Sequence, residues 1–495
     1  MRVRRGALEM VRDEDGTSTV LVDGQVIALS EVAAAILEAT PLDGAVSLEQ
    51  LTDAVVASVG RPPAPLEALD VVQHQVHDLV AHRLLVTDEA TAGAPVTAAS
   101  VAALRSCLRH VMSPSPDRWS LPDGVSGTQL LAASERHRVT PTLARSSDRL
   151  ALPAASAAGL AAVDRQQSAT VDLLAHDLAR VLDRLDHAGI RCICFKGLPL
   201  AVQAHGDVAA RGTGDLDLLV PPADLERAHR VLVAAGWSPA GGYPSPGSSW
   251  AWRHFVRTNN ELALVSPTSM VDLHWHLGPA RSAFPDFDTL WARRAWVDVL
   301  GREVPTLSPY DALAHSASHA AKDGWHWMRG IVDVHRLIAD PRTWDGVDRP
   351  LHQDQLLTVG LAVRMLGMPR HAPPVLAEAA EQAARVWDAT MRRQATGAAT
   401  HQPTRVPGLA LVRGVRALRW AGASRADLWH HLSHSALPEW LTYQEASPHA
   451  AVVVPRVLGR RATAFLQRAR AARAGEPSDG HSPPRDPRDT AARLS

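Results

Sequence analysis

Three aspartates interrupt two short apolar segments of this chain, DLDLLV at 215–220 and SMVDLHWHL at 269–277. Both segments are typical of strands. In a strand, residues i and i+2 point to the same face, so Asp215 and Asp217 place two carboxylates side by side. Asp272 lies in the middle of the second segment, between apolar neighbours. Because a buried carboxylate is costly unless it is paired or binds a metal, the fold has to supply a compensating positive charge.

A divalent cation would remove the repulsion between these carboxylates, which would otherwise force one of them to protonate. Mg²⁺ prefers carboxylate oxygens together with phosphates and water. Three carboxylates on adjacent strands are the arrangement that two-metal phosphoryl or nucleotidyl transfer requires. Gly212 and Gly214 let the loop before the first strand approach a ligand closely. The residues therefore predict a metal-dependent transfer site at Asp215, Asp217 and Asp272.

The surrounding pattern predicts a small sheet between helical regions. Residues from about 99 to 190 are mostly helical in pattern, and IRCICF at 190–195 is typical of a short buried strand. ELALV at 261–265 is expected to pair with 269–277. From Ser308 to about 472 the pattern is helical again.

Three motifs together resemble the bacterial "uncharacterised nucleotidyltransferase" family, which is part of the DNA polymerase β-like nucleotidyltransferase superfamily. The resemblance covers about 100 to 345 and rests on FKG-x-x-LA, R-x-x-GD-x-DLLV and DLHW, which begin at Phe195, Arg211 and Asp272. It implies an α+β, mostly α fold in which a small mixed-sheet core lies between helical regions. The chain departs from the superfamily pattern in one place, because Lys-Gly replaces the usual Gly-Ser pair and the spacer to Asp215 is longer.

The resemblance also implies residue roles and cofactors. Two Mg²⁺ ions would be held by three catalytic carboxylates, Asp215, Asp217 and Asp272, with Asp272 also acting as the base for the acceptor hydroxyl. The expected nucleotide-binding residues are Lys196, Gly197, Arg211 and Gly214. The co-substrate would be an NTP, with ATP as the expected one. The reaction would be in-line attack on the α-phosphate with pyrophosphate leaving, although the residues leave a phosphotransferase variant open.

The helix expected after Ser308 carries further candidates for substrate binding. His315, His319 and Lys322 lie at i, i+4 and i+7, on one helical face, and Arg329 with Asp333 forms another i, i+4 pair. Lys322 and Arg329 are expected to close over the nucleotide or acceptor, and the alternative is a solvated face with a weak ion pair. The substrate-binding set predicted here is His274, His319, Lys322 and Arg329. A zinc site at His315 and His319 is disfavoured because no third ligand lies nearby in the sequence.

The sequence leaves two interpretations open for each of several aromatic and histidine residues near the expected site. Trp325 and Trp327 are predicted either to stack on a base or to belong to the core. His274 and His276 share a face with Asp272, which leaves either contact with the acceptor or a simple lining role for both.

The N-terminal segment has a separate character. Residues 18–29 predict a hairpin around Asp23-Gly24, Ser30 is expected to cap one helix, and a capping box of Ser47 and Gln50 a second. A third helix is expected at about 66–83, followed by a short strand. This winged-helix-like pattern resembles the PqqD-like peptide-binding domains, in which a leader peptide adds a strand to the sheet edge.

The charge of this segment favours some classes of binding partner over others. Residues 1–95 carry a net charge of −9 and no lysine, which would repel the phosphates that supply most nonspecific DNA affinity. The interpretations that stay open are a leader or precursor peptide as ligand, and an interaction or dimerisation domain without one. The expected domains are 1–90, a linker at 91–100, the catalytic domain at 101–305, a helical domain at 306–472 and a disordered tail at 473–495.

Composition limits the cellular compartment that we expect for this chain. The 495 residues include three cysteines, too few for a disulfide framework, which favours a reducing cytoplasm. Neither a signal peptide nor a membrane span is expected. Of 51 basic residues only Lys196 and Lys322 are lysines, and both fall inside the region of resemblance. Two other functions stay open, a non-catalytic peptide-binding scaffold and, because of the C-terminal arginines, an antitoxin-like or tRNA-modifying nucleotidyltransferase that contacts RNA.

Overall fold

The computed structural model describes most of the chain. The described residues are 2–5, 10–14, 17–22, 25–41, 46–62, 67–81, 84–87, 96–240, 243–266, 268–396, 409–437, 442 and 445–473. The turn at Asp23-Gly24 and the tail beyond 473 lie outside them. Within the described residues, no helix combines the length and the apolar character that crossing a membrane requires.

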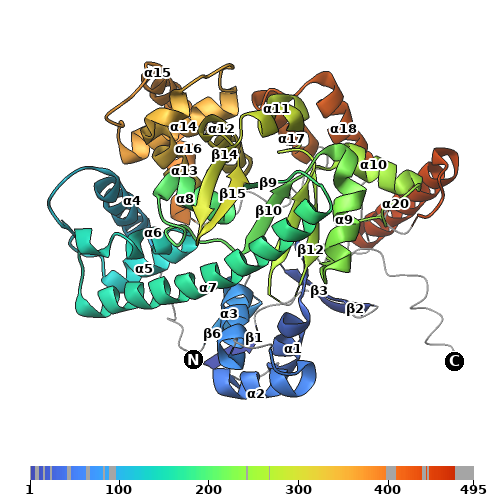
Figure 1. Cartoon of the computed structure of the whole chain (residues 1–495), viewed down its shortest axis with the longest axis horizontal. Coiled ribbons are helices and arrows are strands. Elements are labelled where there is room, and N and C mark those ends of the chain that lie inside the picture. Colours follow the sequence, from blue (N-terminus) through green and yellow to red (C-terminus); the bar gives the residue numbers. More distant parts are fainter. Residues whose placement is uncertain are drawn as a thin grey trace.

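The N-terminal region forms two small sheets and three helices, below the rest of the molecule in Figure 1. Its elements are β1 (Arg2–Arg5), β2 (Met10–Glu14), β3 (Thr17–Val22), β4 (Gln25–Ala28), α1 (Glu31–Ala39), β5 (Val46–Ser47), α2 (Leu48–Val59), α3 (Ala68–Ala81) and β6 (Leu85–Thr87). The sheets run β5-β1-β6 and β2-β3-β4. The antiparallel pairing of β3 with β4, the Ser30 cap and the Ser47–Gln50 capping box are confirmed.

Helices precede the central sheet, as the pattern predicted. They are α4 (Ala98–Met112), α5 (Gly127–Arg136), α6 (Thr140–Ala144) and α7 (Ala154–His187), with the short parallel pair β7 (Trp119–Ser120) and β8 (Leu150–Ala151) and the 3-10 turn η1 (Ser147–Arg149) between them. The helix α4 starts inside the expected linker at 91–100, where Thr97 caps it. In Figure 1 the long helix α7 extends from the left edge of the molecule to the central sheet.

The central sheet has five strands in the order β11-β12-β13-β10-β9. Its elements are β9 (Ile193–Phe195), α8 (Gly197–His205), β10 (Asp215–Leu219), η2 (Pro222–Asp224), α9 (Leu225–Ala234), β11 (Ser238–Pro239), α10 (Trp250–Thr258), β12 (Glu261–Val265) and β13 (Met270–His274). The predicted antiparallel pairing of 261–265 with the next strand is confirmed. The neighbours β10 and β13 run parallel, which places the aspartates of the two strands side by side.

Apolar residues from both sides of the sheet form separate cores. Residues of α7, α9 and α10 pack with Leu216, Leu218 and Leu273 on one side. Phe195 and Leu219 pack instead with the helices that follow the sheet. The strands β9, β10 and β13 are therefore held between two helical layers.

The C-terminal half is helical after one further hairpin. Its elements are η3 (Arg281–Ala283), α11 (Phe287–Ala292), β14 (Ala295–Val299), β15 (Arg302–Thr306), α12 (Pro309–Lys322), α13 (Met328–Ala339), η4 (Pro341–Trp344), α14 (Gln353–Leu366), α15 (Val375–Gln382), α16 (Ala384–Thr396), α17 (Leu409–Trp420), α18 (Arg425–Ala436) and α20 (Ala450–Arg473). The β14–β15 hairpin was missing from the sequence prediction. It packs against α8 and β9, beside the expected site.

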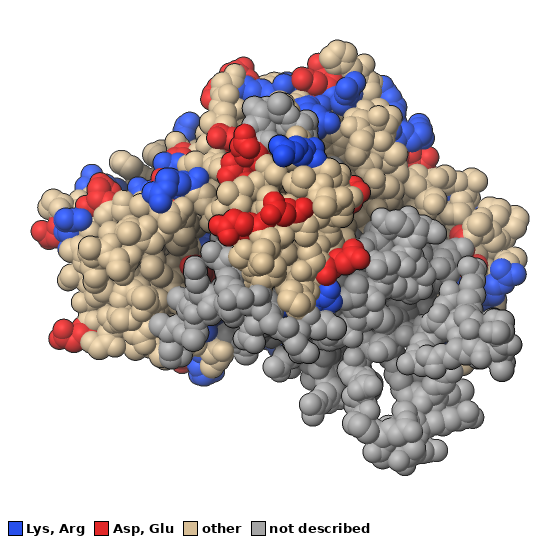
Figure 2. Space-filling model, turned by 90° about the horizontal axis from the view of Figure 1, so that it is seen from below, with Lys and Arg blue, Asp and Glu red and all other residues tan. Residues whose placement is uncertain are grey.

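Charge is mixed over the described part of the face seen in Figure 2. On the face seen in Figure 2, acidic side chains gather near the centre of the described surface and basic ones toward its upper edge, so neither sign covers it. This distribution agrees with the overall net charge of −1. Recognition of a charged ligand therefore has to depend on local groups.

Candidate active site

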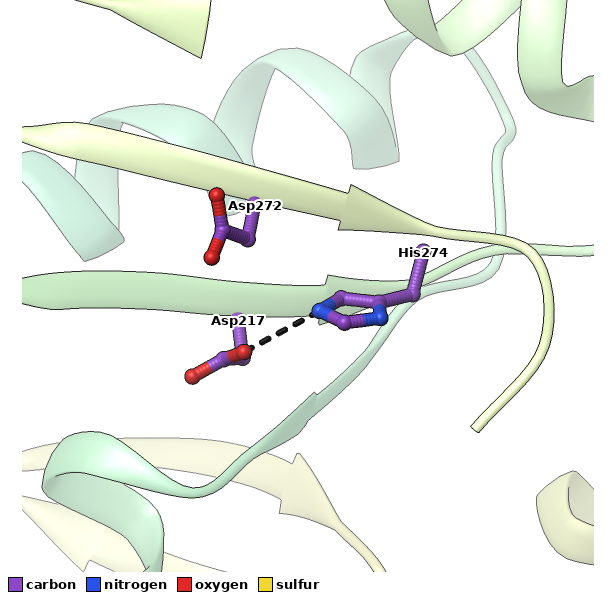
Figure 3. Close-up of side chains that lie close together, drawn as sticks. All are labelled: Asp217, Asp272 and His274. Atoms are coloured by element: carbon purple, nitrogen blue, oxygen red, sulfur yellow. Dashed lines mark hydrogen bonds and ion pairs between the residues drawn. The ribbon is translucent and has the colours of Figure 1, made fainter. Parts of the chain in front are cut away.

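Two aspartates from neighbouring strands lie directly opposite each other. In the parallel pairing of β10 with β13, Asp217 is in register with Asp272, and both side chains project from the same face of the sheet (Figure 3). Ligand atoms of Asp217, Asp272 and His274 all lie within 4.8 Å of one another. The predicted convergence of carboxylates is present, with a histidine added to the group and with Asp215 outside that tight cluster.

Lys196 reaches this cluster from the turn between β9 and α8. Its Nζ donates to Asp217 Oδ1 at 2.5 Å. The turn bends sharply, since Lys196 has a φ of 57° and Gly197 a φ of 39°. A Cβ on Gly197 would lie 3.0 Å from Thr213 Oγ1 and 3.2 Å from the Asp215 carbonyl oxygen. Only glycine fits at position 197 without strain, so the turn requires Gly197.

His274 connects Asp217 to a further carboxylate. Its Nε2 lies 3.0 Å from Asp217 Oδ1 and its Nδ1 lies 3.1 Å from Glu261 Oε2. Glu261 comes from β12, the strand on the other side of β13. The ring of His274 also packs edge-on against Phe195, with ring centroids 4.8 Å apart. These contacts fix the imidazole between two carboxylates.

The carboxylates of the site titrate very differently. Burial raises the pKa of Asp272 well above its ordinary value, and the charges of Asp217 and Asp215 raise it further. Burial and the charge of Asp217 also raise the pKa of Asp215. Burial would raise the pKa of Asp217 too, but Lys196 and His274 outweigh it and hold that pKa below its ordinary value. Asp217 is thus the carboxylate that stays ionised.

A cavity of about 200 Å³ opens beside Asp215 and Asp217, on the side of α12 and α13. Its charged and aromatic lining consists of Arg138, Lys196, Arg211, Asp215, Asp217, His315, His319, Asp323, His326, Trp327, Arg329 and Asp333. Four of these side chains are lysine or arginine. Such a wall favours an anionic ligand next to a group of carboxylates.

Two arginines of the cavity are held by the structure around it. Arg211 donates from Nε to Asp333 Oδ2 at 2.9 Å, and His205 Nε2 lies 2.9 Å from the other oxygen of Asp333. Arg329 donates to the Gly212 carbonyl at 2.9 Å. A weak ion pair of Arg329 with Asp333 was the alternative to a functional role, and the structure instead pairs the two oxygens of Asp333 with Arg211 and His205.

The remaining predicted residues divide between the cavity and its surroundings. His319 lines the cavity, and burial lowers its pKa to about 3, so it is neutral at neutral pH. Lys322 is exposed and lies outside the cavity lining. Gly214 is exposed as well, in the loop that precedes Asp215. The structure thus brings His274, His319 and Arg329 to the site and leaves Lys322 at its edge.

The two tryptophans have different positions. Trp325 is buried and donates to Thr358 Oγ1 at 2.8 Å, so it belongs to the core. Trp327 lines the cavity, where the Arg138 guanidinium lies 4.2 Å from its ring centroid. His276 is outside the cavity lining, beyond the end of β13.

The residues present fit a divalent cation. Asp217 Oδ2 is buried without a hydrogen-bond partner. Among the described residues no hydrogen bond or ion pair reaches the Asp272 carboxylate, whose negative charge its neighbours oppose. Two carboxylates and one imidazole are a donor set that divalent metals accept. His315 and His319, by contrast, are not part of a metal-ligand group within the described part of the chain.

Two functional residues were missed by the sequence analysis. Arg138 precedes the sheet by a long stretch of chain and has a positive φ of 58°, which no local pattern indicates. Glu261 was read only as the start of a strand, and its approach to His274 depends on the pairing of β12 with β13. Both contacts arise from the tertiary fold.

Comparison with known proteins agrees with this chemistry. Residues 124–365, just under half of the chain, match the family model described as "Uncharacterised nucleotidyltransferase". The matched range contains the cavity, the sheet and the helices α12 and α13. The match identifies the chain as a nucleotidyltransferase.

Solved structures and curated proteins add little to that assignment. One structure, described as an antigenic nucleotidyltransferase-like protein from Paracoccidioides brasiliensis, is 16% identical, with a TM-score of 0.27, and covers 43% of this chain and 93% of its own. At that similarity it carries no argument about the site. The search of curated proteins found no match.

Proposed function

We propose that this enzyme moves a nucleoside monophosphate from an NTP onto an acceptor hydroxyl, with Mg²⁺ held by aspartates of β10 and β13. The observation that carries the proposal is the in-register pair of Asp217 and Asp272 next to a cavity with four basic side chains. A triphosphate needs such cations, and the carboxylates need divalent metal. One wall of the site thus suits the phosphates and the other suits the metal.

The chain's residues take distinct roles in this reaction. Asp215, Asp217 and Asp272, with His274, would hold two Mg²⁺ ions, which when bound neutralise charge developing on the phosphates. Lys196, Arg329 and Arg138 orient the triphosphate through their positive charges. The acceptor oxygen bonds to the α-phosphorus, the bond to the β-phosphate oxygen breaks, and pyrophosphate leaves.

A proton has to leave the acceptor hydroxyl in the same step. We assign it to Asp272, because no hydrogen bond or ion pair among the described residues engages that carboxylate, which lies in register with Asp217. Arg211 takes a supporting role in this scheme, since Asp333 already holds its guanidinium at the cavity wall. Its charge still faces the phosphates.

The acceptor is proposed to be a peptide precursor or a pathway intermediate brought by the N-terminal region. The charge of −9 on residues 1–95 suits a basic peptide and disfavours nucleic acid there. Contact with the catalytic region supports delivery, since His74 Nδ1 of α3 lies 3.1 Å from Thr170 Oγ1 of α7. The free, buried cysteines Cys107, Cys192 and Cys194 support a reducing compartment such as the cytoplasm.

Calorimetric titration with ATP in the presence of Mg²⁺ tests the site. We expect the full chain to bind ATP and a double variant, Asp215→Ala with Asp217→Ala, to lose Mg²⁺-dependent binding. Equal ATP binding by both proteins, or none by either, would contradict the proposal and favour a non-catalytic scaffold. RNA copurifying with the chain and labelled by it would instead favour an RNA-directed nucleotidyltransferase.

A further inference from the structure

We propose that Lys196 is a built-in counter-ion of the metal site, which weakens metal binding until an NTP is present. The inference rests on the proposed function, because it concerns the same carboxylates. It assigns to the lysine of the Lys-Gly turn a second role beside phosphate contact, namely to couple metal binding to nucleotide binding.

The position of Lys196 is set by its backbone. The strand β9 ends at Phe195, and the positive φ at Lys196 turns the chain directly into α8. The side chain passes over the Phe195 ring, with Nζ 5.4 Å from the ring centroid, and meets Asp217 Oδ1. A lysine held by a strained turn on a buried carboxylate is pre-positioned in the absence of any ligand.

Lys196 supplies the main positive charge that balances the negative carboxylates of the cluster. Asp215, Asp217, Asp272 and Glu261 influence one another there as like charges. Within the part of the chain that the structure describes, Lys196 is the only lysine or arginine that forms an ion pair with one of these four carboxylates. The ammonium group donates to Asp217 Oδ1 at 2.5 Å and places a full positive charge directly on that carboxylate.

The other basic residues of the cavity are engaged elsewhere. Arg211 pairs with Asp333, Arg329 donates to the Gly212 carbonyl, and Arg138 lies over Trp327. Removal of Lys196 would therefore leave the carboxylates with only more distant charges, such as those of Arg211, Arg329 and Lys322. A divalent ion would then meet a more negative site.

The same ammonium opposes an incoming divalent cation. Two like charges a few ångströms apart repel strongly at the effective dielectric of a protein site, so removal of Lys196 is expected to tighten metal binding by about tenfold. Lys196 also lines the cavity, where the negative charge of a triphosphate would attract it. An NTP therefore offsets the repulsion, and metal and nucleotide strengthen each other's binding.

Mn²⁺ titration of the full chain, followed by electron paramagnetic resonance of the free ion, tests this role without turnover. In the absence of nucleotide, Lys196→Met is expected to bind Mn²⁺ about tenfold more tightly than the natural protein. Lys196→Arg keeps the charge and is expected to stay within about twofold of the natural protein. Lys196→Gln replaces the Met variant if thermal unfolding shows that the latter does not fold.

A matched control removes a cation from a different buried carboxylate. Arg180 donates to Asp177 Oδ1 at 3.0 Å on α7, outside the cavity lining, so Arg180→Met should leave Mn²⁺ affinity unchanged. A non-hydrolysable ATP analogue should then tighten Mn²⁺ binding more in the natural protein than in Lys196→Met.

The outcomes separate the two proposals. A folded Lys196→Met variant that binds Mn²⁺ no more tightly than the natural protein would overturn the counter-ion role and leave the proposed function standing. No Mn²⁺ binding by any variant, with or without the analogue, would overturn the proposed metal site itself.

Discussion

Asp217 has the most demanding position in the molecule, because it is 3% exposed and shares one face of the sheet with Asp272. The spacing of Asp215 and Asp217 in an apolar strand was enough to predict a pair of carboxylates. Lys196 and His274 were predicted to belong to the same site, but their direct contacts with Asp217 were not predictable, since Lys196 arrives from a turn and His274 from a strand far along the chain. A local sequence pattern can therefore predict a functional residue, but its contacts depend on how distant segments pack in the fold.

Asp217→Asn should reduce nucleotidyl transfer by at least about a hundredfold, because an amide cannot replace a charged metal ligand. The volume is conserved, so the fold should persist. Release of pyrophosphate and thermal unfolding, measured on the same preparation, check both statements. Activity within a few-fold of the natural protein would show that Asp217 is not a metal ligand.

Lys196→Arg should impair NTP turnover although the charge is kept. The ammonium is compact and approaches Asp217 Oδ1 within 2.5 Å in a cramped turn, whereas a planar guanidinium has a different size and donor geometry. Steady-state kinetics with ATP measures the effect. Full activity would make the lysine incidental to phosphate binding.

At the scale of elements, local sequence patterns predict individual strands and helix caps but not how the strands are arranged. The strands at 215–220 and 261–265 and the helix caps at Ser30 and Ser47 follow from local patterns, and the structure contains them. The parallel alignment of β10 with β13 does not follow, because strand order depends on contacts between distant segments. The β14–β15 hairpin was missed because its two turn residues are Leu300 and Gly301, in place of the Asn-Gly or Asp-Gly pair that marks such a turn.

Gly197→Ala tests the turn. The positive φ of 39° and the close approach to Thr213 and the Asp215 carbonyl should together cost about 1–2 kcal/mol of unfolding free energy. Gly278→Ala is the control, because its Cβ would meet only Phe284, at an ordinary 3.7 Å. Urea denaturation compares the two variants, and equal stabilities would mean that the turn is not strained by a side chain.

At the scale of the whole molecule, a buried ion-pair network joins the region of the central sheet to the C-terminal helices. Asp333 of α13 holds Arg211 from the loop before β10 and His205 from α8. Helical spacing left a weak pair of Arg329 with Asp333 open as an alternative, but it says nothing about the residues from elsewhere that hold Asp333. The network therefore holds α13, on one wall of the cavity, in a fixed position relative to α8 and to the loop before β10.

This network should make stability depend on acid. Burial alone would raise the pKa of Asp333, but Arg211 and His205 hold that pKa well below its ordinary value of 3.8. A depressed pKa in the folded state adds stability above the unfolded pKa and loses it as pH falls below about 4. Asp333→Asn should therefore be less stable than the natural protein at pH 7, by about 3–5 kcal/mol.

The difference between these two proteins should shrink as the pH is lowered from 5 toward 3, because the unfolded natural chain then takes up a proton at Asp333 that the folded protein, with its depressed pKa, does not. Denaturant unfolding at a series of pH values measures it. A difference that stays constant over this range would contradict the assigned role of the Asp333 charge.

The fate of the phosphates tests the central claim most directly. The full chain is incubated with Mg²⁺ and a pool of candidate peptides, in parallel with ATP labelled at the α-phosphate and ATP labelled at the γ-phosphate, and products are followed by mass spectrometry. The account predicts that the α-label moves to an acceptor while the γ-label leaves as pyrophosphate, and that Asp217→Asn abolishes both. Transfer of the γ-label with release of ADP would contradict it.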